Sequence, residues 1–256
     1  MPRKFDEVYR GPPSWLDPDK ELSLEKSPTY PTRAAFVIAT MEHLLKAGLL
    51  PRQAAGVVAN AANESGWGRH CFWGNSGGWK ITQAYATEHK RRTGEAPFWW
   101  KARGNVDSAD QPWCFYRAFD SLGAFLDEWC THFVPRPEVA APPYPGYKRC
   151  GQQFWNGGPW FPELILVGYK GGPSKLKMKA VRFAGLPATT HPSVRDHEIM
   201  TKDCLEIYAQ SRLDVDPDGA FGPKSVAALR AWQLLHGLRP TGELDAPTLR
   251  ALFASA

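Results

Sequence analysis

The sequence lacks any apolar run close to the roughly 20 residues that a membrane-spanning helix needs. It also has no apolar stretch after the basic residues of its N-terminus, MPRKFDEVYRGPPSWLDPDKE, so no signal peptide is visible. These two absences predict a protein that does not insert into a membrane and that is made in the cytoplasm.

Cysteine is scarce, and its pattern argues against two common uses. The five cysteines are an odd number and include no C-x-x-C pair, which speaks against a disulfide framework and against a structural zinc site. We therefore expect mostly buried free thiols. The five are Cys71, Cys114, Cys130, Cys150 and Cys204.

Charge is unevenly divided along the 256 residues, which can hold one medium domain and a small one. Residues 1–195 carry 25 Lys and Arg against 17 Asp and Glu, whereas residues 196–256 carry 6 against 9. The basic part could attract an anionic polymer such as peptidoglycan or nucleic acid. The basic residues are scattered, and their longest run is Lys90-Arg91-Arg92, which argues against nucleic acid.

Apolar residues between positions 54 and 62 recur at helical spacing and predict an amphipathic helix that starts near Pro51. Glu64 follows Ala61 by three residues, which places it at the edge of the buried stripe and away from the solvent face. Partial desolvation there raises a carboxyl pKa and lets the group hold a proton near neutral pH, as a general acid must. The alternative is a solvated glutamate, or one paired with an arginine.

Glycine surrounds the aromatic residue that follows this helix. Gly66 and Gly68 end the predicted helix on either side of Trp67 and leave its ring with little cover, as a sugar-stacking cleft requires. Ten of the eleven tryptophans lie within residues 1–160. Trp79 also has glycine neighbours, so we predict that these two rings bind sugar; for the other tryptophans a core role is favoured.

Four short segments resemble, in order, the autolysin and flagellar-type β-N-acetylglucosaminidases. Glu64–Gly68 (ESGWG) is similar to the catalytic-helix signature of that family, and Asn75–Ile81 (NSGGWKI) to its Asn-x-Phe-Gly-Ile-Lys stretch. Phe115–Phe125 resembles its Phe-Arg-x-Tyr-x-Ser segment, and Val167–Tyr169 its late Ala-Gly-Tyr. The resemblance covers about residues 33–180 and implies a lysozyme-like peptidoglycan hydrolase domain: mainly α, with a small irregular and β lobe.

The same resemblance implies roles for particular residues. Glu64 would be the catalytic acid, and Tyr169 would face it. Thr87-Glu88-His89 resembles the Thr-Glu-Tyr that carries the second acid in some relatives, so we prefer Glu88 as second carboxylate, with Glu95 as the alternative. The residues expected to bind substrate are Trp67, Asn75 and Trp79.

The chain repeats itself near its C-terminus. Residues 217–229 (PDGAFGPKSVAAL) align with residues 240–252 (PTGELDAPTLRAL) at a spacing of 23. Each half predicts a turn followed by a capped helix, and together they resemble the three-helix peptidoglycan-binding domain often appended to wall hydrolases. Asp214-x-Asp216-x-Asp218-Gly219 also has the opening spacing of a calcium loop, although a turn is the simpler explanation.

We therefore predict a proline-rich N-terminal arm (1–30), a lysozyme-like glycosidase domain (31–184), a linker (185–196) and an all-α peptidoglycan-binding domain (197–256). The expected activity is that of an endo-β-N-acetylglucosaminidase on peptidoglycan, acting as a monomer without metal or organic cofactor. Alternatives are a muramidase or lytic transglycosylase of the same fold, or a non-catalytic wall-binding protein. We expect an endolysin-like enzyme of a phage, or an injected effector, that reaches the wall after lysis-type release or dedicated export.

Overall fold

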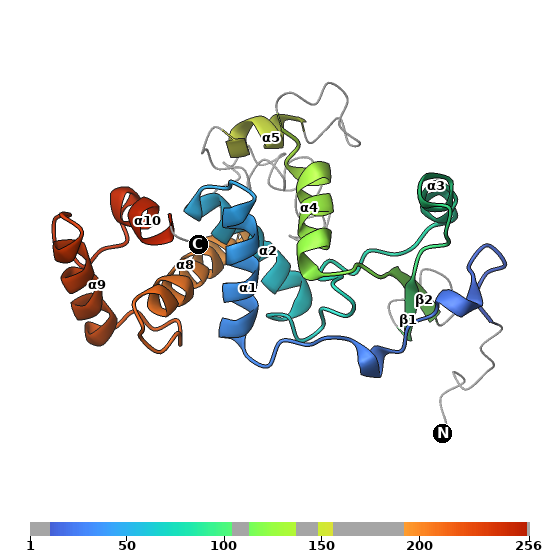
Figure 1. Cartoon of the computed structure of the whole chain (residues 1–256), viewed down its shortest axis with the longest axis horizontal. Coiled ribbons are helices and arrows are strands. Elements are labelled where there is room, and N and C mark those ends of the chain that lie inside the picture. Colours follow the sequence, from blue (N-terminus) through green and yellow to red (C-terminus); the bar gives the residue numbers. More distant parts are fainter. Residues whose placement is uncertain (1–10, 104–112, 137–147, 156–191, 255–256) are drawn as a thin grey trace. The chain divides into compact units, whose positions relative to one another are not determined.

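The described part of the chain forms a mainly helical structure with a small two-stranded sheet, which confirms the predicted fold class (Figure 1). This computed structural model describes residues 11–103, 113–136, 148–155 and 192–254. The chain divides into two compact units. The first unit comprises Met1–Thr29 and His70–Phe125, and the second comprises Tyr30–Arg69 and Leu126–Ala256. Within the described ranges, no helix is both long and apolar enough to cross a bilayer. The predicted domain boundaries stay a prediction.

Three helices of the second unit pack against one another: α1 (Arg33–Lys46), α2 (Pro51–Ser65) and α8 (Pro192–Arg212). Thr32 caps α1, because its hydroxyl oxygen accepts a hydrogen bond from the backbone N–H of Ala35 at 3.0 Å. Every residue of α2 from Gln53 to Ala62 is buried. The alanines and Gly56 on this helix are small enough to let α1 and α8 approach closely.

The C-terminal part of the second unit is all-helical, as predicted. α8 is followed by α9 (Pro223–Leu235) and α10 (Ala246–Phe253). Asp245 caps α10 by accepting a hydrogen bond from the backbone N–H of Thr248 at 2.9 Å. α10 packs on α8, where the rings of Phe253 and Tyr208 meet edge to face with centroids 4.8 Å apart.

Two further helices are α4 (Leu122–Phe133) and α5 (Lys148–Trp155). Ser121 precedes α4, and its hydroxyl oxygen accepts a hydrogen bond from the backbone N–H of Ala124 at 3.1 Å. The helix ends before Pro135 and buries Trp129, in agreement with the periodicity of its sequence. Its first turn belongs to the first unit and the remainder to the second.

Among its described residues, the first unit contains a short antiparallel sheet, the helix α3 and two short 3-10 helices. Its elements are two 3-10 helices, η1 (Pro18–Lys20) and η2 (Leu24–Lys26), then α3 (Gln83–Thr93), β1 (Trp99–Arg103) and β2 (Trp113–Arg117). The strand register pairs Trp99 with Arg117 and Arg103 with Trp113. A small core lies around the buried Trp99, and its other members are Leu16, Ile81, Ala86 and Phe115.

Residues 11–29, which belong to the predicted N-terminal arm, are held against this sheet. The backbone N–H of Leu22 donates to the carbonyl of Trp99 at 2.8 Å, and the Trp99 indole N–H donates to the carbonyl of Asp17 at 2.8 Å. Leu16 is buried in the core and Trp15 packs against it. Residues 11–29 are therefore part of the first unit.

Four cysteines are free thiols, as predicted: Cys71, Cys114, Cys130 and Cys204. Burial raises the pKa of the Cys71 thiol and of the Cys130 thiol to about 12, which keeps both protonated and unreactive at neutral pH. The side chain of Cys150 lies outside the described residues.

Candidate functional site

The turn after α2 carries the candidate acid. Gly66, Trp67 and Gly68 have φ values of +59°, +62° and +81°. Ser65 ties the turn together, since its hydroxyl donates to the carbonyl of Ala61 at 2.6 Å and accepts from the backbone N–H of Gly68 at 2.9 Å. A bulky residue such as Trp67 rarely occupies this left-handed region, and backbone strain of this kind is typical of functional sites.

Gly68 is required by its surroundings as well as by its backbone. A side-chain Cβ at this position would lie 2.4 Å from Cδ2 of Phe36 and 3.1 Å from Cδ2 of Tyr30. These two rings meet edge to face at a centroid distance of 5.2 Å. The glycine therefore lets the turn lie directly on α1.

Glu64 lies in the last turn of α2, directly before this strained turn. The prediction placed Glu64 at the edge of the buried stripe, and the structure corrects this detail, because the Glu64 side chain is exposed. Its neighbour Asn63 is exposed as well, whereas Ala62 and Ser65 are buried. Desolvation by the surrounding protein still raises the pKa of the Glu64 carboxyl group, which confirms the predicted direction. The group is thus reachable by a ligand and favours its protonated form more than an ordinary glutamate does.

Trp67 is less open than its glycine neighbours suggest. The Arg33 guanidinium lies over the indole, with Cζ 3.7 Å from the ring centroid. The ring is partly buried. A sugar stacked on Trp67 would have to use the face opposite the guanidinium.

Asn75 and Trp79 lie together in a loop of the first unit. The Asn75 amide donates to the carbonyls of Trp79 at 2.9 Å and Arg117 at 3.0 Å, and its oxygen accepts from the backbone N–H of Trp79 at 2.8 Å. Asn75 is buried. These contacts make it a structural residue of the loop, and a substrate contact from this segment would come from its neighbours.

Trp79 also has more cover than predicted. Its ring meets Phe125 at a centroid distance of 5.2 Å and Phe119 at 6.3 Å, both edge to face. The guanidinium carbon of Arg117 lies 5.3 Å from the ring centroid. The ring is partly buried, so part of its surface is left for a ligand.

The two candidate second carboxylates are both exposed and both ion-paired. Glu88 on α3 accepts two hydrogen bonds from Arg91, at 2.8 Å from Nε and 2.6 Å from Nη2. This hydrogen bonding lowers the pKa of Glu88. Glu95 accepts a hydrogen bond from Lys20 Nζ at 2.9 Å, which lowers the pKa of Glu95 in the same way. Both are therefore ionised at neutral pH.

The structure does not bring all the predicted residues into one unit. Glu64 and Trp67 belong to the second unit, whereas Asn75, Trp79, Glu88 and Glu95 belong to the first. Tyr169 lies outside the described residues.

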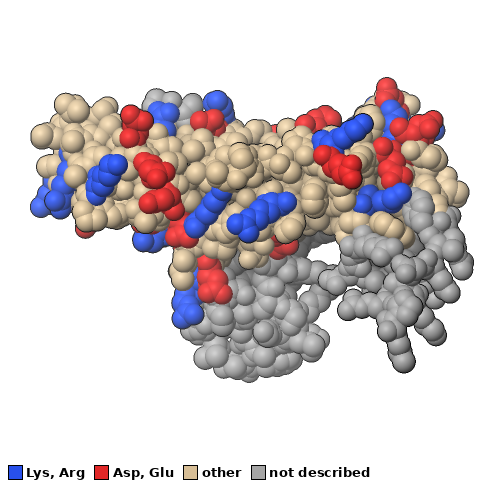
Figure 2. Space-filling model, turned by 90° about the horizontal axis from the view of Figure 1, so that it is seen from below, with Lys and Arg blue, Asp and Glu red and all other residues tan. Residues whose placement is uncertain are grey.

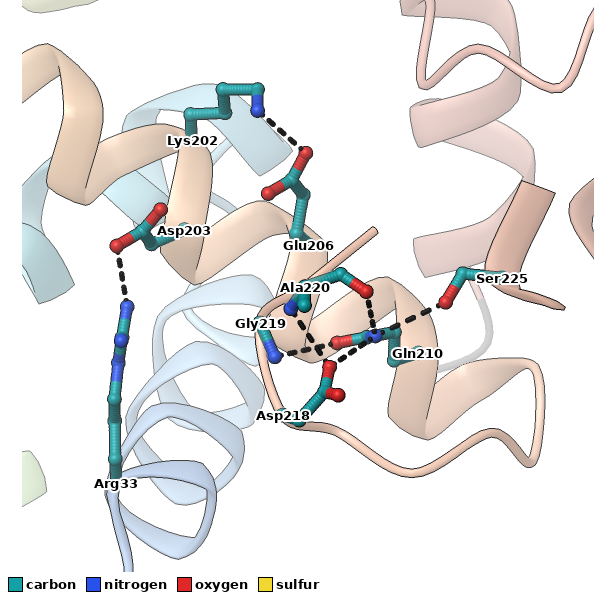
Figure 3. Close-up of polar contacts among 9 residues, drawn as sticks. All are labelled: Arg33, Lys202, Asp203, Glu206, Gln210, Asp218, Gly219, Ala220 and Ser225. Atoms are coloured by element: carbon teal, nitrogen blue, oxygen red, sulfur yellow. Dashed lines mark hydrogen bonds and ion pairs between the residues drawn. The ribbon is translucent and has the colours of Figure 1, made fainter. Parts of the chain in front are cut away.

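The C-terminal repeat is held by a residue that sequence reasoning missed. The Gln210 amide donates to Asp218 Oδ1 at 2.8 Å and Ser225 Oγ at 3.1 Å, and its oxygen accepts from the backbone N–H of Gly219 at 2.9 Å (Figure 3). The Asp218 carboxylate also accepts from the backbone N–H of Ala220 at 2.7 Å, and this bond lowers the pKa of Asp218. Asp218 thus shapes a turn, as the simpler of the two predictions had it.

An equivalent glutamine lies 23 residues later, at the spacing of the repeat. Gln233 donates to Thr248 Oγ1 at 2.9 Å and Thr241 Oγ1 at 3.2 Å, and accepts from the backbone N–H of Gly242 at 2.8 Å. Both glutamines are buried. Each half of the repeat therefore has one glutamine that holds its turn and its helix start together, and the identity of residues 210 and 233 was the signal that could have revealed it.

Charges are mixed on the face of the molecule shown in Figure 2. Blue and red side chains lie close together across it, and among the residues described there neither sign forms a continuous patch. Groups of three or more metal-ligating side chains are likewise not found in the described ranges.

Residues 202–252 match the family model described as "Putative peptidoglycan binding domain". The match covers most of α8, all of α9 and most of α10, and includes both glutamine networks. The chain therefore carries a peptidoglycan-binding domain at its C-terminal end, as predicted. No curated protein and no solved structure matches the chain.

Proposed function

We propose that the protein is a peptidoglycan hydrolase that cleaves β-1,4 glycosidic bonds of the wall glycan, with Glu64 as general acid. One observation carries this proposal: an exposed glutamate with a raised pKa lies at a strained turn of the same compact unit that contains the peptidoglycan-binding segment. Perturbed titration at an accessible position is typical of catalytic groups.

The chemistry requires Glu64 to be protonated when substrate binds. It donates its proton to the glycosidic oxygen, the bond to the anomeric carbon breaks, and the sugar on the other side leaves as an alcohol. A water molecule then adds to the anomeric carbon and loses a proton. Trp67 supports a sugar ring beside the acid through the indole face opposite the Arg33 guanidinium.

Water activation has two candidate routes. Glu88 is ionised, as a general base must be, but it must exchange its contact with Arg91 for the water. Alternatively, the acetamido oxygen of the substrate attacks the anomeric carbon, and no second carboxylate is needed. Of the possible linkages, we propose the one that a β-N-acetylglucosaminidase cleaves, because Glu64–Gly68 resembles the catalytic-helix signature of that family. The wall would be reached after lysis-type release or dedicated export.

Digestion of purified sacculi followed by mass spectrometry of the released fragments tests this function. A new reducing-end N-acetylglucosamine supports the proposal in full. A reducing-end N-acetylmuramic acid or an anhydro sugar would reassign the enzyme to the muramidases or the lytic transglycosylases. If the protein binds the wall but releases no fragments, it is a non-catalytic wall-binding protein, and the proposal is overturned.

A further inference from the structure

Arg33 connects the peptidoglycan-binding segment to the candidate catalytic turn. Its Nη2 atom donates to Asp203 Oδ2 at 2.6 Å, and its guanidinium carbon lies 3.7 Å from the centroid of the Trp67 ring. Asp203 is on α8, within the matched residues 202–252 (Figure 3). The Arg33 and Asp203 side chains are 38% and 29% exposed, so both are partly shielded from water.

The first turn of the repeat lies near Arg33. A Cβ at Gly219 would lie 3.9 Å from Cζ of Arg33 and 3.2 Å from Cγ1 of Ile207. Gly219 is held by Gln210, because its N–H donates to the glutamine oxygen at 2.9 Å. The guanidinium therefore has the indole, the carboxylate of α8 and the backbone of the Gln210-bound turn as neighbours.

A planar guanidinium suits this position better than an ammonium group would. It can stack flat on the indole while its edge donates to a carboxylate, and its charge is permanent at any physiological pH. Trp67 follows Gly66 in a left-handed backbone conformation, so its ring orientation is not fixed by a regular helix. The guanidinium over the indole supplies a restraint on the orientation of the ring.

We propose that Arg33, held by Asp203, is a positioning residue that sets the orientation of Trp67 beside Glu64. The peptidoglycan-binding segment then does more than hold the protein on the wall, because its Asp203 and its Gly219 turn determine where the sugar-stacking ring lies. This inference rests on the proposed function for its catalytic consequence. The orientation of Trp67 itself can be tested without activity.

The first test is kinetic and uses soluble glycan fragments. Asp203→Asn keeps the shape of the side chain but removes its charge, and we expect it to lower kcat/KM by about 2- to 10-fold, the range that loss of a cation–π restraint suggests. Binding to sacculi should stay unchanged. In a Trp67→Ala background the same substitution should have no further effect, because Asp203 acts through that ring. Asp203→Glu should restore part of the loss.

Glu206→Gln is the matched control. It is also a carboxylate-to-amide change on α8, but Glu206 pairs with Lys202 at 2.9 Å (Figure 3). Cleavage by this variant should equal that of the wild type. The proposal is overturned if Asp203→Asn cleaves normally, or if its effect and that of Trp67→Ala are simply additive.

The second test needs no catalysis. The protein is labelled with 5-fluorotryptophan, and the ¹⁹F resonance of Trp67 is assigned by its loss in Trp67→Phe. That resonance should shift in Asp203→Asn and in Arg33→Gln, and stay in place in Glu206→Gln. A Trp67 resonance that is unchanged in both variants would refute the positioning role. A shifted resonance in a protein that cleaves no glycan would instead uphold the positioning of Trp67 and refute the proposed function.

Discussion

Glu64 and Glu88 are two exposed helical glutamates that the family resemblance placed in one catalytic site, and their surroundings shift their pKa values in opposite directions. Glu64 precedes a strained turn, and desolvation raises its pKa. Glu88 lies in the middle of α3 with Arg91 one turn ahead, and the hydrogen bonds from Arg91 lower its pKa. Carboxyl groups whose pKa values are pushed apart are suited to opposite roles, one as acid and one as base.

The two environments also differ in how many structural features they require. The ion pair of Glu88 needs only an arginine three residues later on an exposed helix, a contact that contributes little to stability. The environment of Glu64 requires the packing of α2 and a turn of three successive left-handed residues. Because the second arrangement is costlier to maintain, it is the stronger indicator of function.

The largest expected effect separates the two glutamates directly. Glu64→Gln removes the transferable proton while keeping the size of the side chain, and we expect glycan cleavage to fall by about 100- to 10,000-fold. Glu88→Gln should cost much less if the acetamido group of the substrate attacks. Kinetics on soluble glycan fragments measure both. Equal losses would make Glu88 an essential second carboxylate, and normal cleavage by Glu64→Gln would remove Glu64 from the mechanism.

The pH dependence sharpens the same comparison. A general acid acts while protonated, so kcat/KM should fall as pH rises through the pKa of Glu64, by up to about tenfold per pH unit. Since that pKa is raised, the basic limb should lie above the ordinary glutamate value of 4.5. If Glu88 acts as a base, it must be ionised, so kcat/KM should also fall as pH decreases through the pKa of Glu88. That acidic limb should lie below pH 4.5, because the pKa of Glu88 is lowered from that value. A basic limb that persists in residual cleavage by Glu64→Gln would contradict the assignment.

Gly68→Ala tests the turn that distinguishes Glu64. The new methyl group would clash with the Phe36 ring. The alanine would also have to adopt a left-handed backbone conformation with φ of +81°. We expect a loss of unfolding free energy of about 1–3 kcal/mol, visible as a lower melting temperature. Gly94→Ala is the control: its φ is +82°, but no atom lies within 4 Å of its Cβ position. Equal destabilisation by both variants would show that contact with Phe36 contributes nothing.

The smallest expected effect concerns the ion pair between Arg91 and Glu88. Arg91→Gln removes the hydrogen bonds that lower the pKa of Glu88, so that pKa should rise toward 4.5. Titration followed by carboxyl ¹³C NMR measures the change. Glycan cleavage at neutral pH should stay within about twofold, since Glu88 remains ionised there. A large gain in activity would show that Arg91 normally withholds Glu88 from the reaction.

Much of the fold could be predicted because its signals are local. The apolar stripe up to Ala62 predicted α2, and the 23-residue repeat predicted the C-terminal helices. The raised pKa of Glu64 followed from its position after Ala61. Each of these inferences depends on residues within a few turns of one another.

The missed features depend on contacts between distant residues. Arg33 and Asp203 are 170 positions apart, so no pattern near Trp67 could indicate that a guanidinium covers its ring. The burial of Asn75 depends on the carbonyl of Arg117, 42 positions away. The ion pair between Glu88 and Arg91 is the exception, because an arginine three residues after a helical glutamate can be recognised from the sequence.

Hydrolysis in H₂¹⁸O tests the central claim most directly, with wild type and Glu64→Gln bound to sacculi in equal amounts. We predict that the wild type creates reducing-end N-acetylglucosamine carrying one ¹⁸O atom, and that Glu64→Gln binds the wall equally but forms about 100-fold fewer labelled ends or less. Equal labelling by both proteins, or reducing ends without ¹⁸O from the wild type, would contradict the account.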